Sequence, residues 1–237
     1  MKILSFDTSN KTLAVALFDQ TGILAQRQLN IKSNHSLTLM PAIDELMKEV
    51  SWQPKDLTRI VCAQGPGSYT GIRIAVTTAK MLASTLSIEL VGVSSLKLIA
   101  GNLPYYDGLL VPVFNARRQN VFCGIYQWED GNLVNVMEDT HLPMEELLEK
   151  LQGKKAMILG DGGDFAELIL EKGLEYSKFP HLNLPQGAVL AQLGSTGQPV
   201  ENIHSFLPIY LKKVEAEEKW LEKTGNSSEH ENYVEKI

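Results

Sequence analysis

The sequence predicts an α/β protein made of two lobes and a polar tail. Short apolar runs bounded by turn residues indicate strands, and longer segments with helical spacing follow several of them. The same alternation begins again near Leu109, which indicates a second unit. We place the lobes at residues 1–103 and 104–207, and a charged tail with at most a short amphipathic helix at 208–237.

The first lobe is expected to open with three antiparallel strands joined by tight turns, because turn-forming residues separate three apolar runs. A helix with Ser36 as its N-cap should then run to about Val50, with Pro41 disturbing its first turn. A helix capped by Ser94 or Ser95 should close the lobe. The strands are expected at 3–6, 13–18, 23–29, 59–63 and 88–93, and the long second helix at about 70–86.

The second lobe is expected to repeat the pattern of strands first and helices afterwards. Its strands are expected at 109–114, 119–128, 133–137 and 156–159. Its helices are expected at 144–151, 165–172 and 186–193.

Composition and charge limit the functions of the chain. The 237 residues are 44% hydrophobic, and 28 acidic against 22 basic side chains give a formal net charge of −6. This charge disfavours a protein that binds nucleic acid alone through a broad basic face, although a partner's surface can supply phosphate contacts. Cys62 and Cys123 lie in apolar segments, so we expect two buried free thiols in a reducing compartment and no disulfide framework. Asp7 comes too early for a signal peptide, and no apolar run reaches the roughly 18–20 residues of a membrane helix, so we expect a cytoplasmic protein.

A glycine-rich turn is the first candidate site. Gly65, Gly67, Ser68 and Gly71 lie between a strand and a helix, where backbone N–H groups can bind an anion. The turn fits neither the Walker pattern nor the dinucleotide-binding pattern. A turn that needs glycine only for its geometry explains these residues equally well.

Two more turns carry candidate residues for a nucleotide cleft. Asp7, Thr8 and Ser9 end the first strand, where the carboxylate can hold hydrated Mg²⁺ and the turn can bind phosphate. Asp161, Gly162 and Gly163 join a later strand to a helix. Plain turns account for both segments as well.

Metal and nucleophilic chemistry find no support in the residue pattern. The five histidines are far apart and form no ligand pair, and no Gly-x-Ser-x-Gly elbow is present. We therefore predict no metal site and no catalytic residue. Arg117 and Arg118 can contact phosphate, although a solvated hairpin tip also explains them.

The two long helices of the first lobe suggest a protein interface. The second helix is apolar nearly all round, so its two sides both need cover, and a sheet covers only one of them. The first helix, another subunit or both can cover the other side, and an exposed apolar face favours a homodimer when the chain is alone. The expected interface residues are Leu37, Met40, Met47, Ile72, Val76, Ala79 and Ala83.

Five motifs together resemble the TsaB (YeaZ) family. They are Asp7-Thr8-Ser9, His35-Ser36-x-x-Leu39-x-Pro41-x-Ile43, Gly65-Pro66-Gly67-Ser68-Tyr69-Thr70-Gly71-Ile72-Arg73, Ala79-Lys80-x-Leu82-Ala83 and Pro208-Ile209-Tyr210-Leu211. The resemblance is close over residues 1 to about 102 and looser over 109–220. It implies the two-lobed fold of the actin, sugar-kinase and Hsp70 (ASKHA) superfamily with mixed sheets.

The resemblance also implies a function. TsaB-like proteins serve in making threonylcarbamoyladenosine beside the anticodon of tRNAs that read codons beginning with A. They are non-catalytic and bind the related transferase TsaD through the first lobe's helices, and the ATPase TsaE joins the pair. The tRNA is then bound mainly through the complex. The resemblance implies that the chain requires no cofactor of its own and that ATP or ADP would bind at a site shared with a partner. The residues of the three turns would then be either vestiges of a nucleotide site or part of that shared site.

One departure from the catalytic relative supports this assignment. TsaD carries a strand-end Asn-His followed by x-x-Gly-His, which ligates a metal, whereas the matching stretch here is Val93-Ser94-Ser95-Leu96-Lys97-Leu98-Ile99. Serine and aliphatic side chains cannot replace imidazole ligands. Two alternatives remain: an ATP-dependent kinase or phosphotransferase that uses Asp7 and the glycine-rich turn, and a glycoprotease-like metallopeptidase.

Overall fold

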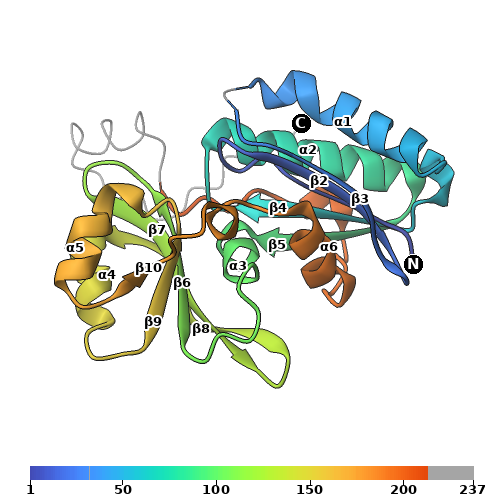
Figure 1. Ribbon diagram of the computed structural model, residues 1–237. Coiled ribbons are helices and arrows are strands. Elements are labelled where there is room, and N and C mark those ends of the chain that lie inside the picture. The colour runs from blue at the N-terminus through green and yellow to red at the C-terminus, as the bar shows by residue number, and fades with distance from the viewer. Residues whose placement is uncertain (32, 213–237) are drawn as a thin grey trace, which may run out of the picture.

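The computed structural model describes residues 1–31 and 33–212, which form two lobes built on one five-stranded sheet each (Figure 1). The first sheet has the strand order β3-β2-β1-β4-β5. Its first three strands are antiparallel, while β4 and β5 run parallel to β1. The strands are β1 (Ile3–Asp7), β2 (Leu13–Asp19), β3 (Gly22–Leu29), β4 (Arg59–Gly65) and β5 (Glu89–Ser94).

Helices cover both faces of the first sheet. On one face, α1 (His35–Glu49) and α2 (Tyr69–Leu86) pack over the side chains of Leu4, Phe6 and Ile60. On the other face, α3 (Ser95–Ala100) and α6 (Gly187–Ser195) pack over Ile3 and Val61. The central strands β1 and β4 are therefore buried on both sides, which explains their nearly uninterrupted apolar sequences, whereas the edge strand β3 is partly exposed.

The second sheet repeats the topology of the first. Its order is β10-β9-β6-β7-β8, with antiparallel β6, β7 and β8 and with β9 and β10 parallel to β6. One face is covered by α4 (Met144–Lys150) and α5 (Ala166–Glu171), and α3 packs on the opposite face between the lobes (Figure 1). The strands are β6 (Leu109–Asn115), β7 (Asn120–Glu129), β8 (Asn132–Pro143), β9 (Ala156–Gly160) and β10 (Glu175–Tyr176). Single 3₁₀ turns are η1 (Pro54–Asp56), η2 (Gly163–Phe165), η3 (Pro180–Asn183) and η4 (Ile203–Ser205).

The end of the described chain returns to the first lobe. We expected residues 104–207 to form the second lobe, but Leu190 and Ala191 of α6 pack in the first lobe's core, as does Phe206. The backbone N–H of Val200 donates to the Leu90 carbonyl at 2.8 Å. Without this segment, part of one apolar face of the first sheet, beside α3, would stay open to water.

Three smaller expectations differ from the structure. Asn34, not Ser36, caps α1, because its side chain accepts a hydrogen bond from the Ser36 N–H at 3.2 Å. The helix runs through Pro41 without a break. The strand expected at 133–137 extends to Pro143 as β8. Most of the expected tail helix lies outside the described residues, and residues 208–212 are irregular.

Candidate functional site

The two turns of the first lobe pack directly against each other. The Ser68 N–H donates to the Ser9 carbonyl at 2.6 Å, and the Thr8 hydroxyl donates to the Gly71 carbonyl at 2.7 Å. A Cβ atom on Gly71 would overlap the carbonyl oxygen of Thr8, and one on Gly67 would overlap that of Ser9. These glycines therefore allow two backbone segments to touch, where an anion-binding turn would need open space.

Asp7 lies buried beneath this contact. Its Oδ1 accepts a hydrogen bond from the Ser9 N–H at 2.6 Å, while Oδ2 has no hydrogen-bond partner among the described residues. Burial raises the pKa of the Asp7 carboxyl to about 6, against the opposing effect of the bonds from Ser9. Asp7, Thr8 and Ser9 are each 1% exposed or less. These three side chains cannot reach a phosphate or a hydrated Mg²⁺ while the turns are packed.

The rest of the glycine-rich turn also serves the first lobe. Gly65 is buried at the end of β4, where the Ile209 N–H donates to the Gln64 carbonyl at 2.9 Å. Ser68 is exposed and caps α2, because its hydroxyl accepts from the Gly71 N–H at 3.3 Å. Of the predicted site residues in this turn, Ser68 is the one whose side chain faces solvent.

The third turn lies in the second lobe, apart from the other two. The Asp161 N–H donates to the Val113 carbonyl at 2.8 Å, and the Tyr176 ring packs beside Gly162. Asp161 lines a cavity of about 720 Å³ that also includes Lys11 of the first lobe. The structure therefore joins two of the three predicted turns and leaves the third facing them across the space between the lobes.

Five of the seven predicted interface residues are core residues. All five are at most 6% exposed: Met47, Val76, Ala79 and Ala83 belong to the core between α1, α2 and the first sheet, and Ile72 is buried beside the glycine-rich turn. Small side chains on this face let α2 lie close to β4. As contacts to a partner these five were predicted wrongly, because they are covered within the chain.

The outward faces of the two helices present other residues. Leu37 and Met40 of α1 are 71% and 42% exposed, as expected for an interface, and Met81 of α2 is 50% exposed. The exposed positions of α2 are Tyr69, Thr70, Arg73, Thr77, Met81, Ser84 and Thr85, which include no acidic residue. Such a face loses little solvation energy when a partner covers it.

The stretch that matches the metal site of the catalytic relative has a different task here. The Ser94 hydroxyl accepts hydrogen bonds from the N–H groups of Leu96 and Lys97 and so caps α3. Within residues 1–31 and 33–212, no three His, Cys, Asp or Glu side chains gather as metal ligands. The donor atoms at this stretch do not fit a transition metal, which disfavours the metallopeptidase alternative.

A polar cluster that connects the lobes has no signal in the residue pattern. Ser94 and Tyr126 both donate hydrogen bonds to the Asp139 carboxylate, and burial raises the pKa of Asp139. Ser94 belongs to the first sheet, while Tyr126 and Asp139 belong to β7 and β8. Because these residues are far apart in the chain, only the folded structure reveals the cluster.

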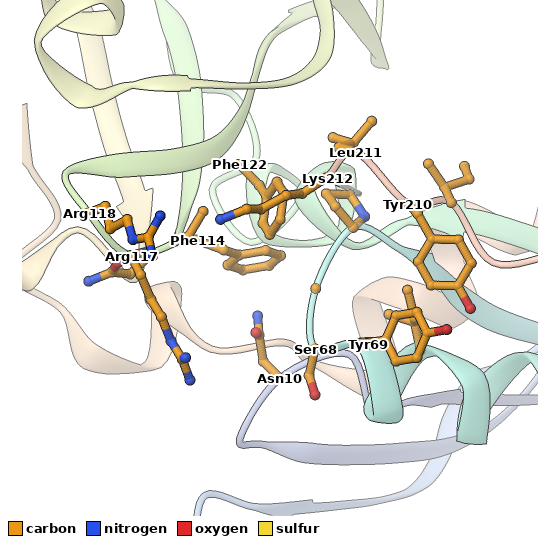
Figure 2. Close-up of a pocket in the computed structure, with 16 residues that line it drawn as sticks. Asn10, Ser68, Tyr69, Phe114, Arg117, Arg118, Phe122, Tyr210, Leu211 and Lys212 are labelled. Carbon is orange, nitrogen blue, oxygen red and sulfur yellow. Dashed lines mark hydrogen bonds between the residues drawn. The ribbon is translucent and has the colours of Figure 1, made fainter. Parts of the chain in front are cut away.

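A second feature between the lobes is a cavity of about 440 Å³, which we call the interlobe cavity (Figure 2). It lies beside the glycine-rich turn, the β6–β7 hairpin and residues 209–212. Arg117 and Arg118, considered above as phosphate contacts, lie at its edge with positive φ angles of 67° and 51°. On its other side, the guanidinium of Arg73 lies 4.0 Å from the centre of the Tyr69 ring, and its Nε donates to the Tyr210 hydroxyl at 2.6 Å.

Comparisons with known proteins agree on one family. A family model described as "TsaD: tRNA N6-adenosine threonylcarbamoyltransferase" matches residues 22–173. A Bacillus subtilis protein named tRNA threonylcarbamoyladenosine biosynthesis protein TsaB is 39% identical, over 94% of this chain and 99% of the relative. The Escherichia coli protein of the same name is 26% identical, over 90% of this chain and 95% of the relative.

A solved structure supports the fold. YeaZ from Pseudomonas aeruginosa superposes with a TM-score of 0.77 at 25% identity, and the match covers 89% of this chain and 99% of that one. Together with the two mixed sheets, this likeness confirms the expected two-lobed fold. Among the described residues, no helix is both long enough and apolar enough to cross a membrane.

Proposed function

Because this chain belongs to the TsaB family, we propose that it is a non-catalytic subunit in the biosynthesis of threonylcarbamoyladenosine in tRNA. Its partner in this proposal is the transferase TsaD, and the ATPase TsaE joins the pair. The chain itself supplies a docking surface and requires no cofactor. Any ATP or ADP would bind at a site shared with a partner, since the chain's own turns bury their polar groups in one another.

The observation that carries the proposal is the outward face of α1 and α2. Leu37, Met40 and Met81 are large apolar side chains exposed on two helices that lie side by side over one sheet face (Figure 1). The TsaD family model spans this region, so TsaD is expected to carry counterparts of both helices. Two related helix pairs can then meet about a pseudo-twofold axis, as identical subunits do about a true one. The same face favours a homodimer when TsaD is absent.

The buried polar turns support the non-catalytic part of the proposal. A kinase needs a carboxylate that reaches Mg²⁺ and a phosphate, whereas Asp7 is covered by the glycine-rich turn. ATP turnover by the isolated chain that is lost in the Asp7→Asn variant would favour the phosphotransferase alternative.

A binding experiment tests the docking surface. In the Met81→Glu variant we expect at least tenfold weaker binding to TsaD, because the new charge would be buried without a partner. Leu170→Glu is the matched control, since Leu170 is 61% exposed on α5 of the second lobe, and it should change binding less than twofold. Analytical ultracentrifugation of mixtures with TsaD measures both constants, and circular dichroism checks folding.

A reconstituted reaction tests the role itself. Purified TsaD and TsaE, supplied with ATP and an activated threonylcarbamoyl donor, should modify tRNA only when this chain is added, and Met81→Glu should restore little activity. Unchanged modification without the chain, or no complex with TsaD under any condition, would contradict the proposal. Val76→Glu does not serve as an interface test, because Val76 is buried and its variant should unfold.

A further inference from the structure

The interlobe cavity gathers side chains that the proposed docking role leaves unused. It is lined by three cationic side chains, and no Asp or Glu is among its described lining residues. The chain as a whole has a formal net charge of −6, so the sign of the charge around this cavity is opposite to that of the whole molecule. The cationic residues are Arg117, Arg118 and Lys212, and the aromatic ones are Tyr69, Phe114, Phe122 and Tyr210.

The geometry places rings and cations around one space. Figure 2 shows Phe114 and Phe122 next to each other in the middle, Lys212 reaching toward Phe122, and Arg117 and Arg118 beyond them. The Arg117 N–H donates to Asn115 Oδ1 at 2.8 Å, which helps to hold the hairpin tip in its left-handed conformation. Non-glycine residues adopt this conformation at an energetic cost, which is typical of functional loops.

This combination fits a nucleotide better than other ligands. Aromatic rings stack on bases, and arginine and lysine bind phosphates. A volume of about 440 Å³ is within the range of small-ligand sites. A purely apolar ligand would leave the cations unused, and an acidic peptide would leave the rings unused.

The positive charge continues beyond a single nucleotide. Lys11 and Lys178 are exposed and line the adjoining cavity of about 720 Å³, where Asp161 is the acidic side chain among the described lining residues. A chain of cations that follows two cavities suits a strand with several phosphates more than one free nucleotide. We propose that the interlobe cavity binds one unpaired nucleotide of an RNA strand, with its base on Phe122 and its phosphates at Arg117 and Lys212. The choice of RNA over a free nucleotide rests in part on the proposed function.

Direct binding to the full chain tests this inference. The probes are a fluorescein-labelled 17-nucleotide RNA hairpin with a seven-nucleotide unpaired loop, a blunt RNA duplex with the same stem, and ATP as competitor. By fluorescence anisotropy, we expect the hairpin to bind at least fivefold more tightly than the duplex. ATP should displace the hairpin only at concentrations far above the hairpin's dissociation constant.

Variants locate the binding in the cavity. The double variant Arg117→Ala/Lys212→Ala should weaken hairpin binding about tenfold and reduce the salt slope by about 1.4, since each phosphate contact to a single strand contributes roughly 0.7. Phe122→Leu should weaken binding at least fivefold and leave the salt slope unchanged. The double variant Lys154→Ala/Lys172→Ala has the same charge change at exposed positions outside the cavity, and it should change binding less than twofold.

Three results would overturn the inference. They are equal affinity for hairpin and duplex, equal losses in the cavity and control variants, and cavity-dependent binding of ATP without binding of the hairpin. The last result would assign the cavity to a free nucleotide.

The reconstituted reaction separates this inference from the proposed function. The cavity variant should still bind TsaD, and it should raise the KM for tRNA about tenfold with kcat changed less than twofold. An unchanged KM would reject the RNA site and leave the docking role intact. Failure of the wild-type chain to bind TsaD would reject the docking role, while the hairpin measurements would still decide the inference.

Discussion

The glycine-rich turn of the first lobe and the Asp161–Gly163 turn of the second occupy corresponding places in the two sheets. Each follows a strand that runs parallel to its sheet's opening strand, and each leads toward a helix. The first turn is packed backbone to backbone on a neighbouring turn, whereas the nearest atom to a Cβ on Gly163 would be 3.8 Å away. The glycines between a strand and a helix therefore have different roles in the two lobes. In the first lobe they allow close packing of two backbone segments, and in the second they serve the geometry of the turn.

The largest expected difference between the two turns is the loss of folding stability when a glycine is replaced by alanine. Gly71→Ala should lower the free energy of unfolding by about 3–4 kcal/mol, because the new methyl group overlaps a backbone carbonyl that cannot rotate away. Gly163→Ala should change it by less than about 1 kcal/mol. Urea denaturation measures both, and similar losses would contradict the contrast between the turns.

The buried carboxyl of the first lobe should make stability depend on pH. The pKa of Asp7 is about 6 in the folded chain, above its ordinary value of 3.8. Between these values the folded state keeps a proton that the unfolded state has lost, so stability falls as pH rises from about 4 to 6. The fall attributable to Asp7 should approach about 3 kcal/mol at pH 7 and above.

Two variants separate Asp7 from the other acids of the chain. Asp7→Asn should remove this part of the pH dependence, while Asp161→Asn, in the exposed turn, should keep the wild-type curve. Urea denaturation from pH 4 to 8 measures the difference between each variant and the wild type. If the Asp7→Asn curve runs parallel to that of the wild type, the carboxyl is not buried as the structure has it.

A side-chain hydrogen bond should stabilise the turn of the second lobe. Its loss is expected to have the smallest of the three effects on the free energy of unfolding. The Tyr176 hydroxyl donates to the Gly160 carbonyl at 3.0 Å. Tyr176→Phe should therefore cost about 1 kcal/mol of unfolding free energy, as is common for a neutral hydrogen bond. No change in the midpoint of thermal unfolding would indicate that the turn is held by its backbone alone.

Local patterns predicted most elements of the fold because their causes are local. The opening meander, α2 and a serine cap of α3, expected at Ser94 or Ser95 and found at Ser94, follow from turn residues and apolar spacing close in sequence. The path of β8 was predicted only in part, because Asp139 interrupts its apolar pattern and is satisfied by Ser94 and Tyr126. The lobe that α6 covers depends on contacts with Ile3 and Val61, which no local pattern reveals.

The candidate sites were harder to predict for the same reason. Composition indicated that α2 must be covered on more than one side, but it did not indicate which face meets the sheet, so Val76 and Ala79 were assigned to the interface. The interlobe cavity joins Tyr69, Phe122 and Lys212 from three distant segments. Arg117 and Arg118 had a sequence signal as adjacent cations at a hairpin tip, and Gly67 and Ser68 had one as part of a glycine-rich turn, but neither signal indicated the aromatic side chains between them.

The return of α6 and Phe206 to the first lobe has a consequence for biosynthesis. The ribosome makes the first sheet early, but one of its faces is covered only in part, by α3, until residues near 190 have emerged. The second sheet, whose strands all lie between Leu109 and Tyr176, is translated in full before that helix. The half of the molecule that is synthesised first is therefore completed last, and its nascent strands must wait, exposed to chaperones or to aggregation, while the other half acquires its structure.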